Sequence, residues 1–245
     1  MPEGNAVFRY SLSEFVVISG RLCAILTTMF QASASGKIIL FGEHAVVYGR
    51  PAIAVPVMQV RATATIASAQ PGSGLTLDLP DVGERWQVTG QATTQPLVHV
   101  ASLAASQLGL NPLPDWSITL RSTIPVASGL GSGAAAATAI VKAMAAAAGR
   151  PLTPADVSAL VFESETLFHG QASGIDNTVI AYEQPVWFVR GQTPQPFRIA
   201  RAFTIVIGDT GIASPTRLAV GDVRAGWQAE PARFEALFDL SLIHI

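Results

Sequence analysis

The sequence predicts an α+β fold in which short strands fill the first half of the chain and helices follow. Of its 245 residues, 49% are hydrophobic and only 13% are charged, which is typical of a chain with a large buried core. Apolar runs of strand length recur before residue 90. The run from Ala134 to Ala148 instead contains ten alanines and neither glycine nor proline, which predicts a helix.

The expected strands are short and mostly bounded by turn residues. They cover residues 37–41, 52–57, 60–67, 75–79, 86–88, 116–120, 186–189 and 203–207. Residues 60–67 alternate Ala, Val or Ile with Thr or Arg, which indicates one buried face. Residues 42–49 are expected to form a loop or short turn, residues 71–74 a turn, and residues 192–196 a linker.

The expected helices cover residues 97–108, 134–148 and 153–168. Gly109 and Gly149 follow the first two, and glycine is the residue that most often ends a helix. Thr153 and Pro154 are typical of a helix start, with threonine as the N-cap and proline at the first helical position.

Charge and cysteine content exclude several classes of protein. A net charge of −2, without a basic stripe or an aromatic ladder, does not suit nucleic-acid binding. The single cysteine, Cys23, excludes an internal disulfide framework and a cysteine-based zinc site. The histidines His44, His99, His169 and His244 do not have the spacing of metal ligands.

The first residues allow two interpretations. The apolar run from Leu22 to Phe30 precedes Ala32-Ser33-Ala34, which imitates the cleavage site of a secretory signal. That run is too short to span a bilayer. Alternatively, Met29 is the natural start and residues 1–28 are an upstream or non-native extension. The sequence leaves both open, and we expect a cytoplasmic protein without a membrane segment.

The strongest functional signal is Pro125-Val126-Ala127-Ser128-Gly129-Leu130-Gly131-Ser132-Gly133, which leads into the alanine-rich helix. Three glycines within five residues let the backbone adopt positive φ and turn its N–H groups toward one point. The helix N-terminus adds the positive end of its dipole, so the segment suits a phosphate. Its spacing matches neither G-x-G-x-x-G nor a Walker A loop. A tight turn before a packed helix is the alternative.

Two further clusters contain residues suited to chemistry. Lys37, Glu43 and His44 surround a short strand bounded by glycines. A lone lysine or histidine is usually just a solvated side chain. Glu165 and His169, which share a helix with Glu163, are four residues apart and lie on one face, so a surface pair explains them equally well.

A third cluster is Gly170-Gln171-Ala172-Ser173-Gly174-Ile175-Asp176-Asn177. Ser173 and Asp176 have the spacing of a capping box for the segment that follows, and this local explanation competes with a catalytic one. Acidic residues on a loop and a helix, a lysine and a phosphate loop are nevertheless the set of groups that phosphoryl transfer requires.

Taken together, residues 36–49, 125–135 and 169–177 resemble the motifs of the GHMP kinases. Gly-Glu-His-Ala-Val-Val-Tyr-Gly and His-Gly-x-x-Ser-Gly-x-Asp-Asn are most similar to the mevalonate kinase branch. By motif order and spacing, the resemblance covers about residues 32–240. It implies an N-terminal ATP-binding domain like the second domain of ribosomal protein S5, here residues 29–198. The start of a ferredoxin-like C-terminal domain, residues 199–245, would follow, with the active site between the two.

The resemblance also implies an activity, the ATP- and Mg²⁺-dependent phosphorylation of the 5-hydroxyl of (R)-mevalonate in isoprenoid biosynthesis. Asp176 would take the hydroxyl proton, and Lys37 would keep that carboxylate ionised and stabilise charge on the transferring phosphoryl group. Ser132 and Glu165 would lie beside Mg²⁺, which prefers hard oxygen ligands. ATP and mevalonate are thus the implied partners, nucleic acid and membrane are not, and a homodimer is compatible with the family.

The remaining roles implied by the resemblance concern ligand binding. The residues that would surround mevalonate and the phosphate are Glu43, His44, Ser173 and Thr216. The residues that would cradle the ATP phosphates are Pro125, Ser128, Gly129, Leu130, Gly131, Ser132, Gly133 and Ala134.

The sequence departs from the family pattern in three places. Ser35 stands where the family usually has proline, and Gly133 stands where a second serine is usual. The family's glycine-rich third motif is absent before the end at Ser241-Leu242-Ile243-His244-Ile245, so we expect a fragment of low kinase activity. Two alternatives stay open: another GHMP kinase, acting on phosphomevalonate, a sugar or homoserine, and an inactive fragment that only binds nucleotide.

Overall fold

The computed structural model describes residues 7–18, 21–169, 172–208 and 216–240, with side chains from residue 29 onward except at 168–169 and 216–219. Its strands are β1 (Val7–Ile18), β2 (Arg21–Phe41), β3 (Ala52–Ser68), β4 (Leu75–Leu79), β5 (Glu84–Val88), β6 (Trp116–Ser122), β7 (Val186–Phe188) and β8 (Gln195–Pro196). Its helices are η1, a short 3₁₀ helix (Ala45–Tyr48), α1 (Pro96–Gln107), α2 (Ser132–Ala147), α3 (Pro154–His169), α4 (Ile175–Tyr182), α5 (Thr216–Ala229) and α6 (Pro231–Leu240).

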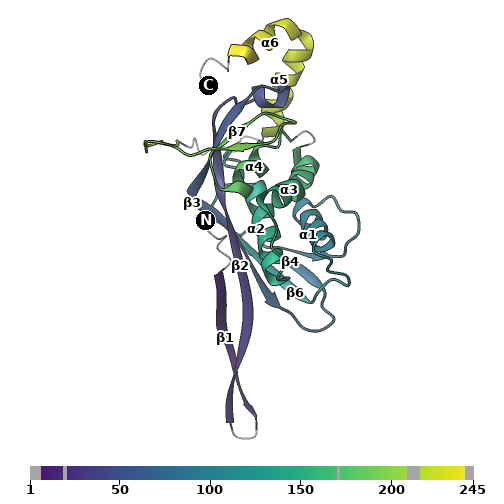
Figure 1. The fold of residues 1–245 in the computed structure, drawn as a ribbon. Coiled ribbons are helices and arrows are strands. Elements are labelled where there is room, and N and C mark those ends of the chain that lie inside the picture. Colours follow the sequence, from purple (N-terminus) through teal and green to yellow (C-terminus); the bar gives the residue numbers. More distant parts are fainter. Residues whose placement is uncertain (1–6, 19–20, 170–171, 209–215, 241–245) are drawn as a thin grey trace.

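The strands form one mixed sheet in the order β1-β2-β3-β6-β4-β5, with β7 pairing with β3 and β8. Every pairing is antiparallel except that of β4 with β6, which is parallel. Helices α1 to α4 lie together beside the sheet, and α5 and α6 lie at the end of the molecule opposite the β1–β2 hairpin (Figure 1). This arrangement confirms the predicted α+β class.

Helix α2 occupies the centre of the core. It packs against β2, β3, α1 and α3, and eleven of its residues are buried, most of them alanines. Alanine has no bulky side chain, so the helix backbone approaches the sheet closely and its N-terminus is held firmly next to β2. The alanine-rich run therefore has a packing role as well as a high helix propensity.

The local signals predicted helices α1, α2 and α3 and the β4–β5 hairpin, but they did not predict helices α4, α5 and α6. The expected helices 97–108, 134–148 and 153–168 correspond to α1, α2 and α3 within two residues at each end. The expected hairpin of 75–79 with 86–88 is the antiparallel pair β4–β5. Thr153 is the N-cap of α3, because its Oγ1 accepts a hydrogen bond from Asp156 N at 3.2 Å and the Asp156 carboxylate accepts one from Thr153 N at 3.0 Å.

Two strand predictions were wrong. The expected strands 52–57 and 60–67 are one strand, β3, in which residues 58–60 form an irregularity between the Gly36–Val57 and Ser35–Arg61 pairs. Residues 203–207, expected as a strand, are not in a strand, and Val206 is 90% exposed. Apolar, β-branched residues make a strand only where another strand pairs with them. The expected linker 192–196 also includes β8, which pairs with β7.

The N-terminal residues extend the sheet. β1 pairs with the first part of β2 from Val7↔Gln31 to Ile18↔Arg21, and the hairpin projects from the rest of the molecule (Figure 1). Neither interpretation of residues 1–28 is decided by this pairing. Within the described residues, no helix is long and apolar enough to cross a membrane.

Candidate active site

An ion pair between Lys37 and Asp176 lies at the centre of the candidate site. Lys37 comes from β2 and Asp176 from the first turn of α4, and Lys37 Nζ lies 2.9 Å from Asp176 Oδ1. Lys37 is only 6% exposed, whereas the Asp176 side chain is 30% exposed. Burial alone lowers the pKa of Lys37, but the charge and hydrogen bond of Asp176, with smaller contributions from Glu43 and Glu165, raise it above its usual value. Lys37 is therefore a cation at neutral pH.

Asp176 does not cap α4, so the capping-box interpretation was wrong. The N-cap of α4 is Gly174, with φ 89°, and this glycine has no side chain to form a cap. The Ser173 hydroxyl accepts a hydrogen bond from Ile175 N at 3.3 Å, while the Asp176 carboxylate pairs with Lys37. A carboxylate that pairs across the fold and remains partly exposed is available to a substrate.

The glycine-rich loop is attached directly to the strand that carries Lys37. Lys37 N donates a hydrogen bond to Leu130 O at 3.0 Å. A Cβ on Gly36 would lie 3.2 Å from Leu130 O, and a Cβ on Gly131 would lie 2.9 Å from Lys37 Cγ. Both glycines are therefore needed for close approach, and Gly131 also has φ 73°.

The loop leaves the N-terminus of α2 without a side-chain cap. Gly131 is the N-cap residue, so the usual capping position has no side chain that could bond to the first turn. Ala127 and Gly129 also adopt positive φ, 57° and 77°. The hydroxyl of Ser128 donates to Pro125 O at 2.9 Å, which closes the start of the loop. Backbone donors of this kind, at the positive end of a helix dipole, suit the binding of a phosphate.

Glu165 on α3 lies next to this helix end. It is 5% exposed, which contradicts the interpretation as a surface pair with His169; the side chain of His169 is outside the described residues. Burial and the charge of Asp176 raise the pKa of Glu165 to about 8, against the opposing effect of Lys37. A Cβ on Gly133 would lie 3.2 Å from Glu165 Oε1, so the serine usual in the family would crowd this carboxylate.

The residues expected to hold Mg²⁺ fit that role. Glu165 is a buried carboxylate beside the start of α2, where Ser132 supplies a hydroxyl. Among the described residues, no group of three or more His, Cys, Asp or Glu side chains could hold a metal. One carboxylate and one hydroxyl nevertheless suit Mg²⁺, because this ion takes its other ligands from water and from the phosphates of a substrate.

Glu43 and His44 lie in the turn that precedes η1. Ala45 N donates to Glu43 O at 2.7 Å, which closes a three-residue γ-turn with His44 at its centre. His44 has φ 59° and ψ −47°, which is the strained form of this turn. A loop or short turn was expected over residues 42–49, but the strain at His44 was not, because no glycine or asparagine occupies this position.

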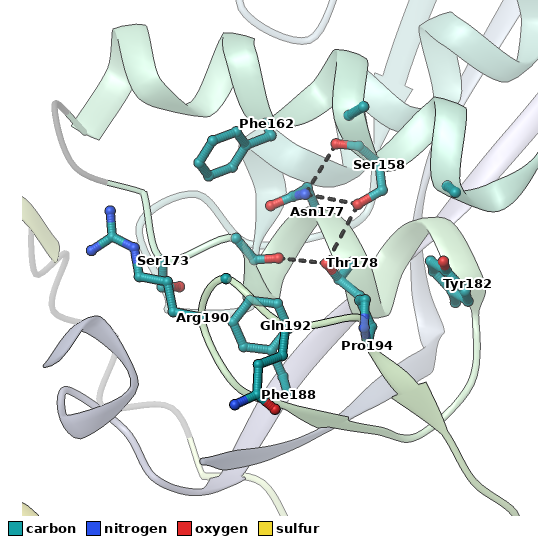
Figure 2. A pocket seen from close by; sticks show the side chains of 14 residues that line it. Ser158, Phe162, Ser173, Asn177, Thr178, Tyr182, Phe188, Arg190, Gln192 and Pro194 are labelled. Carbon is teal, nitrogen blue, oxygen red and sulfur yellow. Dashed lines mark hydrogen bonds between the residues drawn. The ribbon is translucent and has the colours of Figure 1, made fainter. Parts of the chain in front are cut away.

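Ser173 and the buried polar residues of α4 line a pocket of about 470 Å³, shown in Figure 2. Asn177 Nδ2 donates to Ser158 O and Oγ at 3.0 and 2.8 Å, and Thr178 Oγ1 donates to Gly174 O at 2.6 Å. The Asn177 bonds join α4 to α3, whereas the Thr178 bond lies within the first turn of α4. Lys37 and Asp176 are not among the residues that line this pocket.

Two further expectations concern single residues. Thr216 begins α5, but its side chain is outside the described residues, so its substrate-binding role stays a prediction. Ser35, which replaces the usual proline, is completely buried, and its Oγ has no hydrogen-bond partner among the described residues. The binding roles expected for the other site residues also stay predictions.

Sequence comparison relates this chain to a family of small-molecule kinases. Residues 96–184 match the family model "GHMP kinases N terminal domain". The chain is 32% identical over 219 residues to the mevalonate kinase of Thermococcus sibiricus, covering 82% of this chain and 63% of that protein. It is 33% identical over 205 residues to the mevalonate kinase of Aeropyrum pernix, covering 79% of this chain and 61% of that protein. The chain thus spans slightly less than two thirds of these relatives.

Solved structures agree with this relationship. The crystal structure of L. major mevalonate kinase in complex with R-mevalonate has a TM-score of 0.67 and 25% identity, covering 87% of this chain and 66% of that one. The mevalonate kinase of Methanococcus jannaschii has a TM-score of 0.65 and 21% identity, covering 86% of this chain and 72% of that one, and supports the fold alone. By sequence and fold, this chain belongs to the GHMP kinases, with mevalonate kinases among its relatives.

Proposed function

We propose that this chain is an ATP-dependent kinase that phosphorylates the 5-hydroxyl of (R)-mevalonate and produces 5-phosphomevalonate. The observation that carries the proposal is the partly buried Lys37–Asp176 ion pair beside the N-terminus of α2. The pair supports the proposal because phosphoryl transfer needs an acceptor for the hydroxyl proton near donors for a phosphate. The choice of mevalonate as the proposed substrate rests on the mevalonate kinases among the relatives.

Asp176 is the proposed general base. Its side chain is partly exposed, so a substrate hydroxyl can reach it, and its carboxylate is paired with the Lys37 ammonium. As the hydroxyl oxygen attacks the γ-phosphorus, its proton passes to the Asp176 carboxylate, and the bond between the γ-phosphorus and the bridging oxygen of ADP breaks. Lys37, which stays protonated, stabilises the negative charge that develops on the transferred group.

The glycine-rich loop and the first turn of α2 are the proposed site for the ATP phosphates. Ser132 and Glu165 would hold Mg²⁺, which neutralises phosphate charge when it is bound. Glu43 and His44, in the turn before η1, are the proposed ligands of mevalonate, together with Ser173 and Thr216. Glu43 contributes to the raised pKa of Lys37, after the larger effects of burial and Asp176, which supports a position near the ion pair.

The test is an ADP-release assay of the chain with a panel of acceptors: (R)-mevalonate, 5-phosphomevalonate, galactose and homoserine. We expect release to depend on (R)-mevalonate, with Asp176→Asn as the inactive control. A preference for another acceptor would leave the kinase chemistry intact but overturn the substrate. No release with any acceptor, from a folded chain that binds ATP, would overturn the kinase assignment.

A further inference from the structure

The C-terminal helices contact the chain just after the turn that contains Glu43 and His44. The ring of Tyr48, the last residue of η1, stacks on Phe238 of α6 with 4.3 Å between the ring centroids. The ring of Trp227, on α5, also packs against the Tyr48 ring, with 5.3 Å between the two ring centroids. Phe238 is only 6% exposed, although most of α6 is exposed. Its burial therefore depends on this contact with η1.

Arg50 reinforces the contact with charge. Its guanidinium donates to Asp239 Oδ1 through Nε at 3.0 Å and through Nη2 at 2.7 Å, and Nη2 lies 2.6 Å from Glu235 Oε2. It also lies 5.9 Å from the centroid of the Phe238 ring. Multiple charge-assisted hydrogen bonds with fixed geometry are more effective than an isolated surface ion pair.

The same guanidinium also holds the backbone of η1. Arg50 Nη1 donates to Tyr48 O at 3.2 Å, and Arg50 N donates to Ala45 O at 3.2 Å. Arg190, from the loop after β7, donates to Val47 O at 3.1 Å. Carbonyl groups at the end of a helix lack partners within the helix, so these two arginines satisfy the end of η1 and fix its position.

The opposite end of η1 is the strained γ-turn at His44. A positive φ at a residue other than glycine persists only where the surrounding structure enforces it. The helix η1 is a single 3₁₀ turn, and backbone hydrogen bonds from Val46, Val47 and Gly49 connect it to the rest of residues 42–49. A constraint on Tyr48 and Arg50 is therefore transmitted to the backbone of Glu43 and His44.

We propose that Arg50, through its contacts with Glu235 and Asp239 of α6, is a positioning residue that holds Glu43 and His44 in place for mevalonate. This inference rests on the proposed function, because it requires that the turn with Glu43 and His44 binds mevalonate. Arg50 itself touches no reacting atom. The C-terminal helices are thereby part of the substrate site, although they lie outside the domain that would bind ATP.

The test compares Arg50→Met with Arg233→Met in the full chain. Arg233 is also on α6, but it pairs with Glu230 three residues away at 3.1 Å. We expect Arg50→Met to accelerate amide hydrogen exchange at Val46, Val47 and Gly49 by about tenfold, equivalent to about 1.4 kcal/mol. KM for mevalonate should rise by a similar factor, while kcat and KM for ATP change by less than about twofold. Arg233→Met should change none of these.

A second variant guards against a folding defect at Arg50. Glu235→Gln combined with Asp239→Asn removes the partners on α6 and leaves the sequence of η1 intact, and it should reproduce the effects of Arg50→Met. Unchanged exchange and unchanged KM for mevalonate in either variant would overturn the proposal, as would equal losses for both substrates. A parent chain that does not use mevalonate would overturn the proposed function instead, and hydrogen exchange would still decide whether Arg50 holds the turn.

Discussion

The N-termini of α2 and α3 differ in whether residues at the helix start bond to the N–H groups of the first turn. α3 begins with a capping box, in which Thr153 and Asp156 exchange hydrogen bonds between side chain and backbone. α2 begins after Gly131 in the left-handed region, and this N-cap glycine has no side chain to supply a cap. The first turn of any α-helix has four N–H groups without a partner in the helix. α3 satisfies part of this set from its own sequence, and α2 does not.

This difference indicates at which helix end backbone N–H groups remain available to bind a ligand. The end of α2 that begins at Gly131 lies beside Lys37 and Glu165, whereas Thr153 at the start of α3 is exposed. α4 also begins after a glycine in the left-handed region, Gly174, and Asp176 in its first turn pairs with Lys37. A cap at the start of α2 would add local stability but would occupy the donors that an anion needs.

The largest effect should come from Asp176, which occupies the first turn of α4 as Asp156 occupies the first turn of α3. Asp176→Asn keeps the shape of the side chain but removes the base, so turnover should fall by about 10²–10⁴. Affinity for ATP should change little, which equilibrium binding measures beside kcat. Asp156→Asn is the matched control and should leave turnover unchanged. Near-normal turnover in Asp176→Asn would make the two helix starts equivalent and remove the contrast.

Gly131→Val tests whether the uncapped end of α2 binds phosphate. A Cβ here would lie 2.9 Å from Lys37 Cγ, and φ is 73°, so the loop must move. We expect the Kd for ATP to rise by at least about 100-fold, equivalent to roughly 2.8 kcal/mol. The matched control is Gly149→Val at the other end of α2. Gly149 has φ 63°, and a Cβ added there would have no atom within 4 Å. This control should cost stability but not affinity, and equal affinity losses in both would argue against a phosphate loop.

Glu165→Gln tests the surroundings of the α2 N-terminus through the pH dependence of the free energy of unfolding. Burial and Asp176 raise the pKa of Glu165 from 4.5 to about 8, so the folded chain binds more protons than the unfolded chain between these values. The free energy of unfolding should therefore fall as pH rises from about 5 to 8, by roughly a few kcal/mol in the absence of metal. Urea unfolding at several pH values should show a flatter profile for Glu165→Gln.

The same variant examines the proposed metal site. Mg²⁺ favours the ionised carboxylate, so adding it should lessen the loss of stability above pH 7 in the parent chain. Glu165→Gln should raise the Mg²⁺ concentration needed for turnover. If the Mg²⁺ dependence of turnover is the same in both proteins, Glu165 is not a metal ligand.

The smallest effect should come from Thr153→Ala. Losing the cap of α3 should lower the free energy of unfolding by about 1 kcal/mol, measured by urea unfolding. Turnover and ATP affinity should stay unchanged, because this helix end is not part of the site. A loss of activity larger than the loss of stability would show that the capped and uncapped helix ends are coupled.

Local signals in the sequence determined much of the fold. The helix over 134–148, the capped start at Thr153 and the β4–β5 hairpin depend on residues close along the chain, and all were predicted. The family motifs also indicated Lys37 and Asp176 as a functional pair. These features could be predicted because propensity, capping and turn formation act over a few residues.

Tertiary structure decided what depends on distant partners. Only packing buries Glu165 and raises its pKa, and only pairing decides that residues 52–68 form one strand while 203–207 form none. The choice of Asp176 between capping α4 and binding Lys37 was equally open in the sequence. Burial, strand pairing and ion pairing are properties of groups that meet across the fold, so no local pattern specifies them.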